Sequence, residues 1–214
     1  MGTNDITKGN ERFVQENVYS DNQLHLEVAK LRFDFMNKAQ ALIHGDLHSG
    51  SVFVNQESTK VFDPEFAFYG PAGYDVGNII SHLIFSWMHA EYQCSDESQK
   101  HYFQEWVEST VSSILELFKK NTKLVLESNA IDTLSNTEGY IDWYIENIII
   151  DTAATAGLEI IRRIVGEAHV KDIENITNIE KRIIAEQRLI LMGKELILNK
   201  HKIKSGKDYF LLIK

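Results

Sequence analysis

The sequence predicts a mainly α-helical domain with one small β-hairpin. Apolar residues recur at helical spacing through most of the 214 residues, and only one stretch, residues 52–62, places two short β-like apolar runs on either side of a polar turn. A chain of this length can bury a sizeable core. We expect two parts, a polar N-terminal segment over residues 1–22 and a helical domain over residues 23–214.

Composition excludes several classes of function. The formal net charge of −9 argues against nucleic-acid or anionic-membrane surfaces, which need basic patches. No apolar run reaches the length of a membrane span, and the N-terminus lacks the basic and apolar pattern of a signal peptide. The single cysteine, Cys94, cannot form an internal disulfide. We expect a cytoplasmic protein that binds neither nucleic acid nor membrane.

The first elements along the chain lead toward a polar loop. A short helical stripe at residues 13–18 is followed by apolar residues at helical spacing from Leu24 to Leu42, which predicts a long helix that runs up to residue 44. Residues 52–54 and 60–62 then form the two strands of the hairpin, around a turn at residues 55–59.

The later elements are helical. Gly70 to Gly73 breaks the chain, and Asp75 is expected to N-cap a helix that extends through Trp87. Further helices are expected over residues 92–126, 140–164 (apolar on several faces and therefore buried) and 176–198, with a tail at 200–214 that is either docked on the core or frayed.

Three carboxylates, Asp46, Asp63 and Glu65, are expected near the same end of the small sheet. Clustered carboxylates repel one another unless a cation or an acid–base role compensates, and Mg²⁺ is the natural cation for such oxygen ligands. Asp63 and Glu65 are two residues apart, so in an extended chain both would face one ion. Asp46 lies on the other loop, where it could orient a hydroxyl or accept its proton.

Longer motifs around these carboxylates carry a family resemblance. His44-Gly45-Asp46 with the later Asp-x-Glu resembles the catalytic loop and metal motif of the aminoglycoside/choline-kinase-like branch of the protein-kinase fold. The stretches HGDLHSGS (44–51), DPEFAFYGPAGYDVGN (63–78) and GLEIIRRIVGEAHV (157–170) resemble the methylthioribose kinases more closely. The resemblance runs from Glu11 to His201 and covers only the C-terminal half of such a kinase.

The resemblance implies a fold, a reaction and cofactors. It implies the helical C-lobe of an aminoglycoside-phosphotransferase-like fold, with the catalytic loop at 44–51, the metal motif at 63–65 and the N-lobe absent. The reaction would be the ATP-dependent phosphorylation of the 1-hydroxyl of S-methyl-5-thioribose in methionine salvage. Asp46 would be the catalytic residue, and Asp63 and Glu65 would hold Mg²⁺ on the phosphates of ATP.

Several neighbouring residues have two interpretations. His44 is either a general base or a brace for the loop, and we favour the brace because Asp46 is the better-placed acid–base group. His48 either packs in the loop or contacts substrate. Ser51 stands where related kinases place a metal-binding Asn, so either Glu65 takes the second metal role or Ser51 only caps the loop. Family resemblance adds that Asp75 reaches back to hold the loop backbone.

Arg162 and Arg163 close the buried helix. On pattern alone such a pair is solvated or salt-bridged near the negative end of the helix dipole. The resemblance implies instead that the pair reaches the sugar and the transferring phosphate, a role that suits planar guanidinium groups. Neighbours on a helix point about 100° apart, so we expect different roles, and the sequence does not say which arginine points inward.

The nucleotide-binding motifs of kinases are missing from the sequence. Neither a Gly-rich phosphate loop nor a Walker A motif occurs, and we expect no β-lobe ahead of His44. Whether the chain alone is an enzyme therefore stays open. The alternatives are a sugar kinase lobe that works with an N-lobe-bearing chain or as a homodimer, an inactive fragment or interaction protein, and a small-molecule kinase of the aminoglycoside or choline type.

Overall fold

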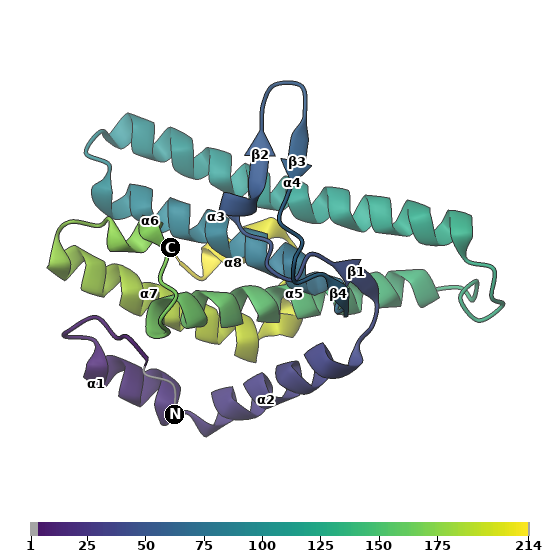
Figure 1. Ribbon diagram of the computed structural model, residues 1–214, viewed down its shortest axis with the longest axis horizontal. Helices are drawn as coiled ribbons and strands as arrows, with labels where there is room; N and C mark the ends of the chain where they lie inside the picture. The colour runs from purple at the N-terminus through teal and green to yellow at the C-terminus, as the bar shows by residue number, and fades with distance from the viewer. Residues whose placement is uncertain (1–3, 214) are drawn as a thin grey trace.

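The computed structural model describes residues 4–213, which form a helical bundle from which one β-hairpin projects (Figure 1). The helices are α1 (Glu11–Val14), α2 (Asn22–Asn37), α3 (Gly73–Gln93), α4 (Glu97–Asn129), α5 (Tyr140–Val165), α6 (Lys171–Glu174), α7 (Ile179–Leu198) and α8 (Gly206–Leu211). Shorter turns are the π-helical η1 (Gln15–Tyr19) and the 3₁₀-helical η2 (Ser49–Ser51) and η3 (Lys200–Lys202). The strands are β1 (Ala41–Ile43), β2 (Val52–Val54), β3 (Thr59–Val61) and β4 (Phe68–Gly70).

Helix α5 is the centre of the core and packs against both α3 and α7. Small residues permit this close packing. A Cβ atom on Gly77 of α3 would lie 2.7 Å from the carbonyl oxygen of Thr152, and one on Gly157 of α5 would lie 2.4 Å from that of Gly193 in α7. The predicted burial of α5 is therefore confirmed, and its bounds match the expected residues 140–164 closely.

The strands form two antiparallel pairs instead of one hairpin. The expected hairpin is confirmed as β2 and β3, with Val52 opposite Val61 and the turn closed by Asn55. The second pair, β1 with β4, was not predicted and aligns Ala41 with Gly70. The three carboxylates therefore do not share one sheet, because Asp46 follows β1 and Asp63 follows β3.

The helix before the loop at residues 44–51 is shorter than its apolar spacing predicts. Helix α2 ends at Asn37, and Leu42 lies in β1, so the prediction of one helix up to residue 44 is wrong. Lys38 leaves helical geometry with a ψ of 90°, and the N–H of Gln40 then bonds to the carbonyl of Gly70 in β4. Pairing with a distant strand overrides local helical periodicity here.

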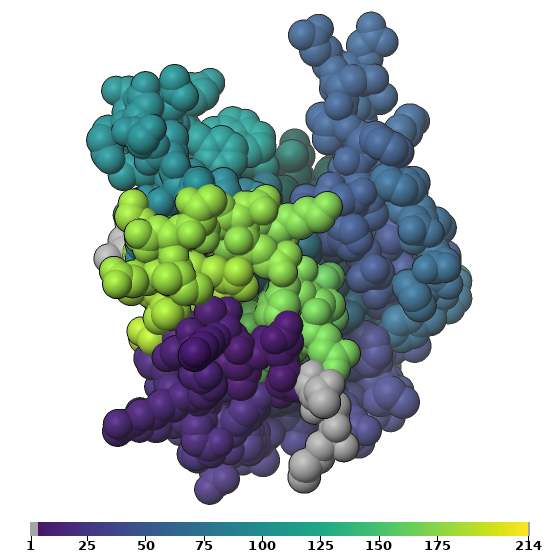
Figure 2. Space-filling view, turned by 60° about the vertical axis from the view of Figure 1, so that its left-hand side comes forward, coloured from purple at the N-terminus to yellow at the C-terminus, as the bar shows by residue number. Residues whose placement is uncertain are grey.

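Both ends of the described chain pack on the bundle. Val14 and Val18 are buried in the same core as α5, and the Asn10 amide donates to Glu186 of α7 at 2.7 Å. At the other end Tyr209 and Phe210 of α8 are buried, so the C-terminal tail is docked and not frayed. Residues 10–18 are therefore part of the domain core, and Figure 2 shows this segment lying against the later helices.

The hairpin stands out from the surface (Figure 2). Its side chains Phe53, Val54 and Val61 are more than half exposed, and the stacked rings of Phe53 and Phe62 lie 4.5 Å apart. Within residues 4–213, no helix combines the length and the apolar character needed to span a membrane.

Candidate active site

The loop that carries Asp46 connects β1 to η2 and is built around Gly45. The φ angle of Gly45 is +85°, a conformation that favours glycine, and a Cβ atom there would lie 2.3 Å from the carbonyl oxygen of Phe66. The loop therefore passes directly over the segment that follows Asp63 and Glu65. This close approach brings the two acidic motifs of the sequence together, although they belong to different sheets.

Asp75 holds the backbone of this loop from the first turn of α3. Its carboxylate oxygens accept hydrogen bonds from the N–H groups of His44 at 2.6 Å and Gly45 at 3.1 Å. Asp75 is not the N-cap of α3, which is Ala72, so that prediction is wrong. Ala72 already has helical backbone angles and makes no side-chain cap, and the Asp75 carboxylate bonds the loop instead of its own helix.

His44 uses both ring nitrogens within the loop region. Its Nε2 lies 2.8 Å from the carbonyl oxygen of Phe62, and its Nδ1 accepts from the N–H of Asp46 at 3.3 Å. With Nδ1 as the acceptor, Nε2 is the ring nitrogen that can donate to the Phe62 carbonyl. This arrangement fits a brace between the catalytic loop and the end of β3 better than a free general base.

Asp46 is held by this scaffold with its side chain 45% exposed. The Nε2 atom of His48 lies 3.8 Å from Asp46 Oδ2, and the Nδ1 atom of His48 accepts from the N–H of Gly50 at 3.0 Å. Burial, together with the positive charges of His82 and Arg163, lowers the pKa of His48 in spite of the nearby Asp46. A neutral His48 does not neutralise the Asp46 carboxylate, which stays accessible from solvent.

Ser51 is buried and bonds locally. Its Oγ donates to the carbonyl oxygen of His48 at 2.8 Å and accepts from the N–H of the same residue at 3.0 Å. These two bonds close the η2 turn before β2. The geometry matches the capping interpretation of Ser51, since the hydroxyl acts both as a donor and as an acceptor within the turn.

Asp63 and Glu65 are exposed, but the segment between them is not extended as expected. Asp63 has a φ of +67°, the one positive φ among non-glycine residues at positions 4–213, and Glu65 begins a turn. Left-handed strain at a side chain of this kind is typical of functional sites. Across residues 4–213 no three His, Cys, Asp or Glu side chains form a closed metal cluster. Two exposed carboxylates nevertheless suit Mg²⁺, which takes few protein ligands and completes its shell with phosphates and water.

Both arginines at the end of α5 bind one buried carboxylate. Glu159, only 5% exposed, accepts from Arg162 at 2.7 and 2.9 Å and from Arg163 at 2.7 Å. Burial alone would raise the pKa of Glu159, but His82 and the two guanidinium groups outweigh it and lower the pKa. Both arginines share this partner because Glu159 stands at positions i−3 and i−4 relative to them, one helical turn away.

The two arginines differ in exposure. The side chain of Arg162 is 48% exposed and that of Arg163 is 14% exposed. Burial would lower the pKa of Arg162, but Glu159 raises it, with smaller contributions from Tyr74 and Asp46. Arg162 is thus close enough to Asp46 for their charges to interact, and about half of its side chain is accessible to solvent.

His82 joins the arginine cluster to the catalytic loop. It is 7% exposed, its Nδ1 lies 3.4 Å from Ser49 Oγ, and its Nε2 lies 3.8 Å from Glu159 Oε1 without a hydrogen-bond partner in the described residues. Its ring centroid is 5.5 Å from that of His48. His82 therefore lies between the loop residues Ser49 and His48 and the carboxylate that binds both arginines.

Glu159 and His82 were missed by the sequence analysis. The signal for Glu159 was present, because Glu159-x-x-Arg162-Arg163 places the acid one turn before both arginines. His82 follows Asp75 by seven residues, two helical turns, and therefore lies on the face of α3 that meets the catalytic loop. Apolar neighbours made both residues resemble ordinary members of a buried helix.

Comparison with known proteins relates this arrangement to phosphotransferases. Residues 10–99 match the model of the "Phosphotransferase enzyme family". Similar proteins include the methylthioribose kinases of Geobacillus sp. (strain WCH70), 37% identical, of Bacillus cereus (strain 03BB102), 39% identical, and of Bacillus thuringiensis subsp. konkukian (strain 97-27), 40% identical. Each alignment covers 90–91% of this chain and 46–47% of the relative, so the chain spans about half the length of the curated relatives it matches.

Proposed function

Because the chain belongs to the methylthioribose kinase family, we propose that it carries the sugar-binding and catalytic part of an ATP-dependent sugar kinase. The reaction would transfer the γ-phosphoryl group of ATP to the 1-hydroxyl of S-methyl-5-thioribose, a step of methionine salvage. The observation that carries the proposal is the half-exposed Asp46 on a braced loop, with the open face of Arg162 within its electrostatic reach.

Asp46 would bind the acceptor hydroxyl and take its proton as phosphoryl transfer proceeds. Support comes from the rigid loop, because Asp75 and His44 fix its backbone at both sides of Gly45. A fixed carboxylate orients the hydroxyl for in-line attack, and positioning supplies much of the rate in phosphoryl transfer.

Asp63 and Glu65 would hold Mg²⁺, which when bound neutralises charge on the β- and γ-phosphates of ATP. Their exposure leaves room for phosphate oxygens and water to complete the shell. Ser51 would contribute by closing the η2 turn and not as a metal ligand.

Arg162 is the arginine that we propose contacts the sugar or the transferring phosphoryl group. Its side chain is half-exposed, whereas Arg163 is largely buried and also donates to the carbonyl of Ala168 at 3.2 Å. Glu159 fixes Arg162 through two hydrogen bonds, so the guanidinium group is oriented before substrate arrives. Arg163 would support that orientation from behind.

The nucleotide would need groups beyond those of this sequence, which has no Gly-rich phosphate loop. We propose that an N-lobe-bearing chain completes the site, since a second copy of this chain would lack the same groups. Exposed apolar side chains favour a protein partner. They lie on the strands and on the segment between β3 and β4: Leu42, Phe53, Val54, Val61, Phe62, Phe66 and Tyr69. The same surface favours the second candidate function, an interaction protein without turnover.

The test is phosphoryl transfer followed by ³¹P NMR with Mg-ATP and methylthioribose. In a mixture with an N-lobe-bearing chain, such as the N-terminal half of a methylthioribose kinase, we expect a sugar 1-phosphate from the wild-type chain. Asp46→Asn should then give at least a 100-fold lower rate with unchanged Mg-ATP binding, because general-base catalysis contributes at least about that factor. Asp142→Asn, a surface change on α5, serves as the matched control. A wild-type rate in Asp46→Asn would rule out its catalytic role, and an inactive wild-type chain would favour the interaction protein.

A further inference from the structure

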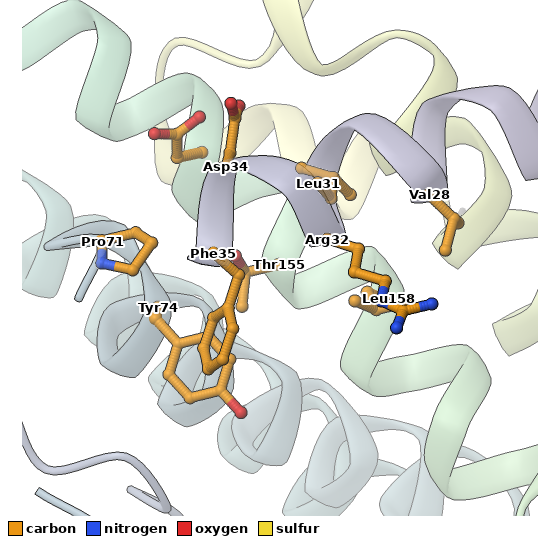
Figure 3. A pocket seen from close by; sticks show the side chains of 10 residues that line it. Val28, Leu31, Arg32, Asp34, Phe35, Pro71, Tyr74, Thr155 and Leu158 are labelled. Carbon is orange, nitrogen blue, oxygen red and sulfur yellow. The ribbon is translucent and has the colours of Figure 1, made fainter. Parts of the chain in front are cut away.

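Helix α3 carries a row of polar side chains on one face. Tyr74, Asn78 and His82 follow one another at intervals of four residues and therefore lie above one another on the helix. Figure 3 shows the first of them, Tyr74, with its ring beside Phe35 at the wall of a cavity and its hydroxyl pointing away from Pro71. Burial raises the pKa of this hydroxyl, and a hydrogen bond with Asn78 partly offsets the rise. The first two members of the row are therefore bonded to each other.

The third member, His82, has a ring nitrogen that is left over. Among residues 4–213, its Nε2 and the hydroxyl of Tyr209 are the two buried side-chain polar atoms without a hydrogen-bond partner. The ring itself is held in place, because Nδ1 lies 3.4 Å from Ser49 Oγ and the ring of Phe85 packs edge-on against it with the centroids 5.7 Å apart. Buried polar atoms are nearly always paired, so the free Nε2 calls for an explanation.

The free nitrogen faces a carboxylate oxygen that is already occupied. Nε2 lies 3.8 Å from Glu159 Oε1, about 0.6 Å beyond the hydrogen-bond range. Oε1 accepts from Arg163 Nε at 2.7 Å and from a terminal nitrogen of Arg162 at 2.9 Å, whereas Oε2 accepts from Arg162 Nε at 2.7 Å. A carboxylate oxygen has two lone pairs, so Oε1 has no place for His82 while both arginines are bound.

We propose that His82 takes the place of Arg162 on Glu159 Oε1 when this arginine turns its terminal nitrogen toward the sugar or the phosphoryl group. His82 is then a positioning residue, and the inference rests on the role of Arg162 in the proposed function. Arg162 keeps its bond from Nε to Oε2, so the guanidinium group stays oriented while its exposed end is released.

The exchange keeps the buried carboxylate satisfied. Glu159 accepts three hydrogen bonds from the arginines before the exchange, and His82 replaces the one that is given up. A buried charge that loses a partner is costly, so a waiting donor makes the release of Arg162 easier.

Proton NMR of the His82 ring tests the exchange directly. The Nε2–H signal, identified by its loss in His82→Leu, should move downfield when methylthioribose is added to the wild-type chain, because a hydrogen bond to a carboxylate forms. The same shift should appear without sugar in Arg162→Met, since this variant leaves one place on Oε1 open. An unshifted signal in either sample would overturn the exchange.

Sugar binding and stability should respond differently to changes of His82. His82→Leu should bind methylthioribose roughly tenfold more weakly in calorimetric titrations, because the released Oε1 lacks its third donor. Its free energy of unfolding without sugar should not fall, because Nε2 makes no hydrogen bond within residues 4–213 in that state. His82→Gln has an amide that can donate to Oε1 and should restore the affinity. His89→Asn, two turns further along α3 beside the carbonyl of Asp172, is the matched control and should bind like wild type.

The outcomes separate the inference from the proposed function. Unchanged sugar binding in His82→Leu, or no recovery in His82→Gln, would overturn the inference and leave the sugar kinase intact. A loss of binding in His82→Leu that is matched by a loss of stability without sugar would mean a merely structural role and would overturn it as well. A wild-type chain that binds no methylthioribose would overturn the proposed function and the inference with it.

Discussion

Single residues set the conformation of the catalytic loop. Gly45 allows the loop to cross the carbonyl of Phe66, and Asp75 and His44 hold the backbone on either side of that crossing. These contacts join positions up to 31 residues apart in the sequence. Gly45 adopts its positive φ without a steric cost, and hydrogen bonds from α3 and to the end of β3 hold the loop in this conformation.

Replacing Gly45 with Ala should destabilise the loop. The left-handed φ costs about 1 kcal/mol for a residue with a Cβ, and the contact at 2.3 Å with a backbone oxygen adds to it because that oxygen cannot move away freely. We expect the free energy of unfolding in urea to fall by about 2 to 3 kcal/mol.

Gly139→Ala is the matched control for this change. Gly139 has a φ of +83° but no atom within 4 Å of an added Cβ, so it should lose only the conformational part, about 1 kcal/mol. Equal losses in the two variants would show that the approach of Gly45 to Phe66 does not constrain the loop.

Glu159 should make stability depend on pH in the acid range. Its pKa is lowered in the folded state, so its contribution is fully present above its ordinary value of 4.5 and is lost as the pH falls below it. Glu159→Gln should destabilise the protein at pH 7 by about 3 kcal/mol, because two guanidinium groups lose a buried partner. The difference from wild type should shrink below about pH 4.5 in urea titrations at several pH values.

The exposed Glu57, at the tip of the hairpin, provides the comparison. Glu57→Gln should leave the free energy of unfolding unchanged at every pH. A pH-independent difference between wild type and Glu159→Gln would contradict the assignment of Glu159 as the carboxylate that pairs with both arginines.

At the scale of elements, the sequence predicted the helices better than the strands. The helices at residues 140–165 and 179–198 could be predicted from apolar periodicity, because the residues that each helix buries recur at helical spacing within its own sequence. Strands β1 and β4 could not be predicted, since each has three residues and the pairing joins segments 29 residues apart at Ala41 and Gly70. Leu42 and Tyr69 are apolar but exposed, so these strands do not show the alternation of apolar and polar residues that marks a half-buried strand.

The candidate site shows the same division. Asp46 and the Asp63–Glu65 pair stand in contiguous motifs, so they were identifiable from sequence alone. The role of the backbone was not, because the positive φ of Asp63 and the crossing at Gly45 depend on contacts between separate segments. His82 reaches the site only through the parallel packing of α3 beside α5.

The contact between α5 and α7 offers a test at this scale. Gly157→Ala would gain up to about 1 kcal/mol of helix propensity, but its Cβ would lie 2.4 Å from the Gly193 carbonyl oxygen. Overpacking against backbone typically costs about 1 to 3 kcal/mol, so the melting temperature should fall by several degrees.

Gly193→Ala gives the reciprocal comparison, since its Cβ would lie 2.8 Å from the Gly157 carbonyl oxygen. Both changes separate the same two helices, so the double variant should lose less stability than the sum of the single changes. A higher melting temperature in Gly157→Ala would mean that helix propensity outweighs the close contact.

The whole molecule combines a rigid bundle with an exposed edge. The β2–β3 hairpin projects from the bundle (Figure 1). The acidic motifs adjoin it in the sequence, its apolar side chains are exposed, and Arg162 and Arg163 lie in the last turn of the buried helix α5. In the proposed function, the sugar would bind on this rigid bundle, and the nucleotide would be bound together with the chain that covers the hairpin side.

The most direct test of this account is the calorimetric titration of methylthioribose into the wild-type chain and Arg162→Met. We predict that the wild-type chain binds the sugar without nucleotide and that Arg162→Met binds at least about tenfold more weakly, since it loses charge-assisted hydrogen bonds to the ligand. Arg12→Met, an exposed arginine on α1, should bind like wild type. Equal affinity in Arg162→Met, or no binding by the wild-type chain, would contradict the assignment of this lobe as the sugar-binding floor of a kinase.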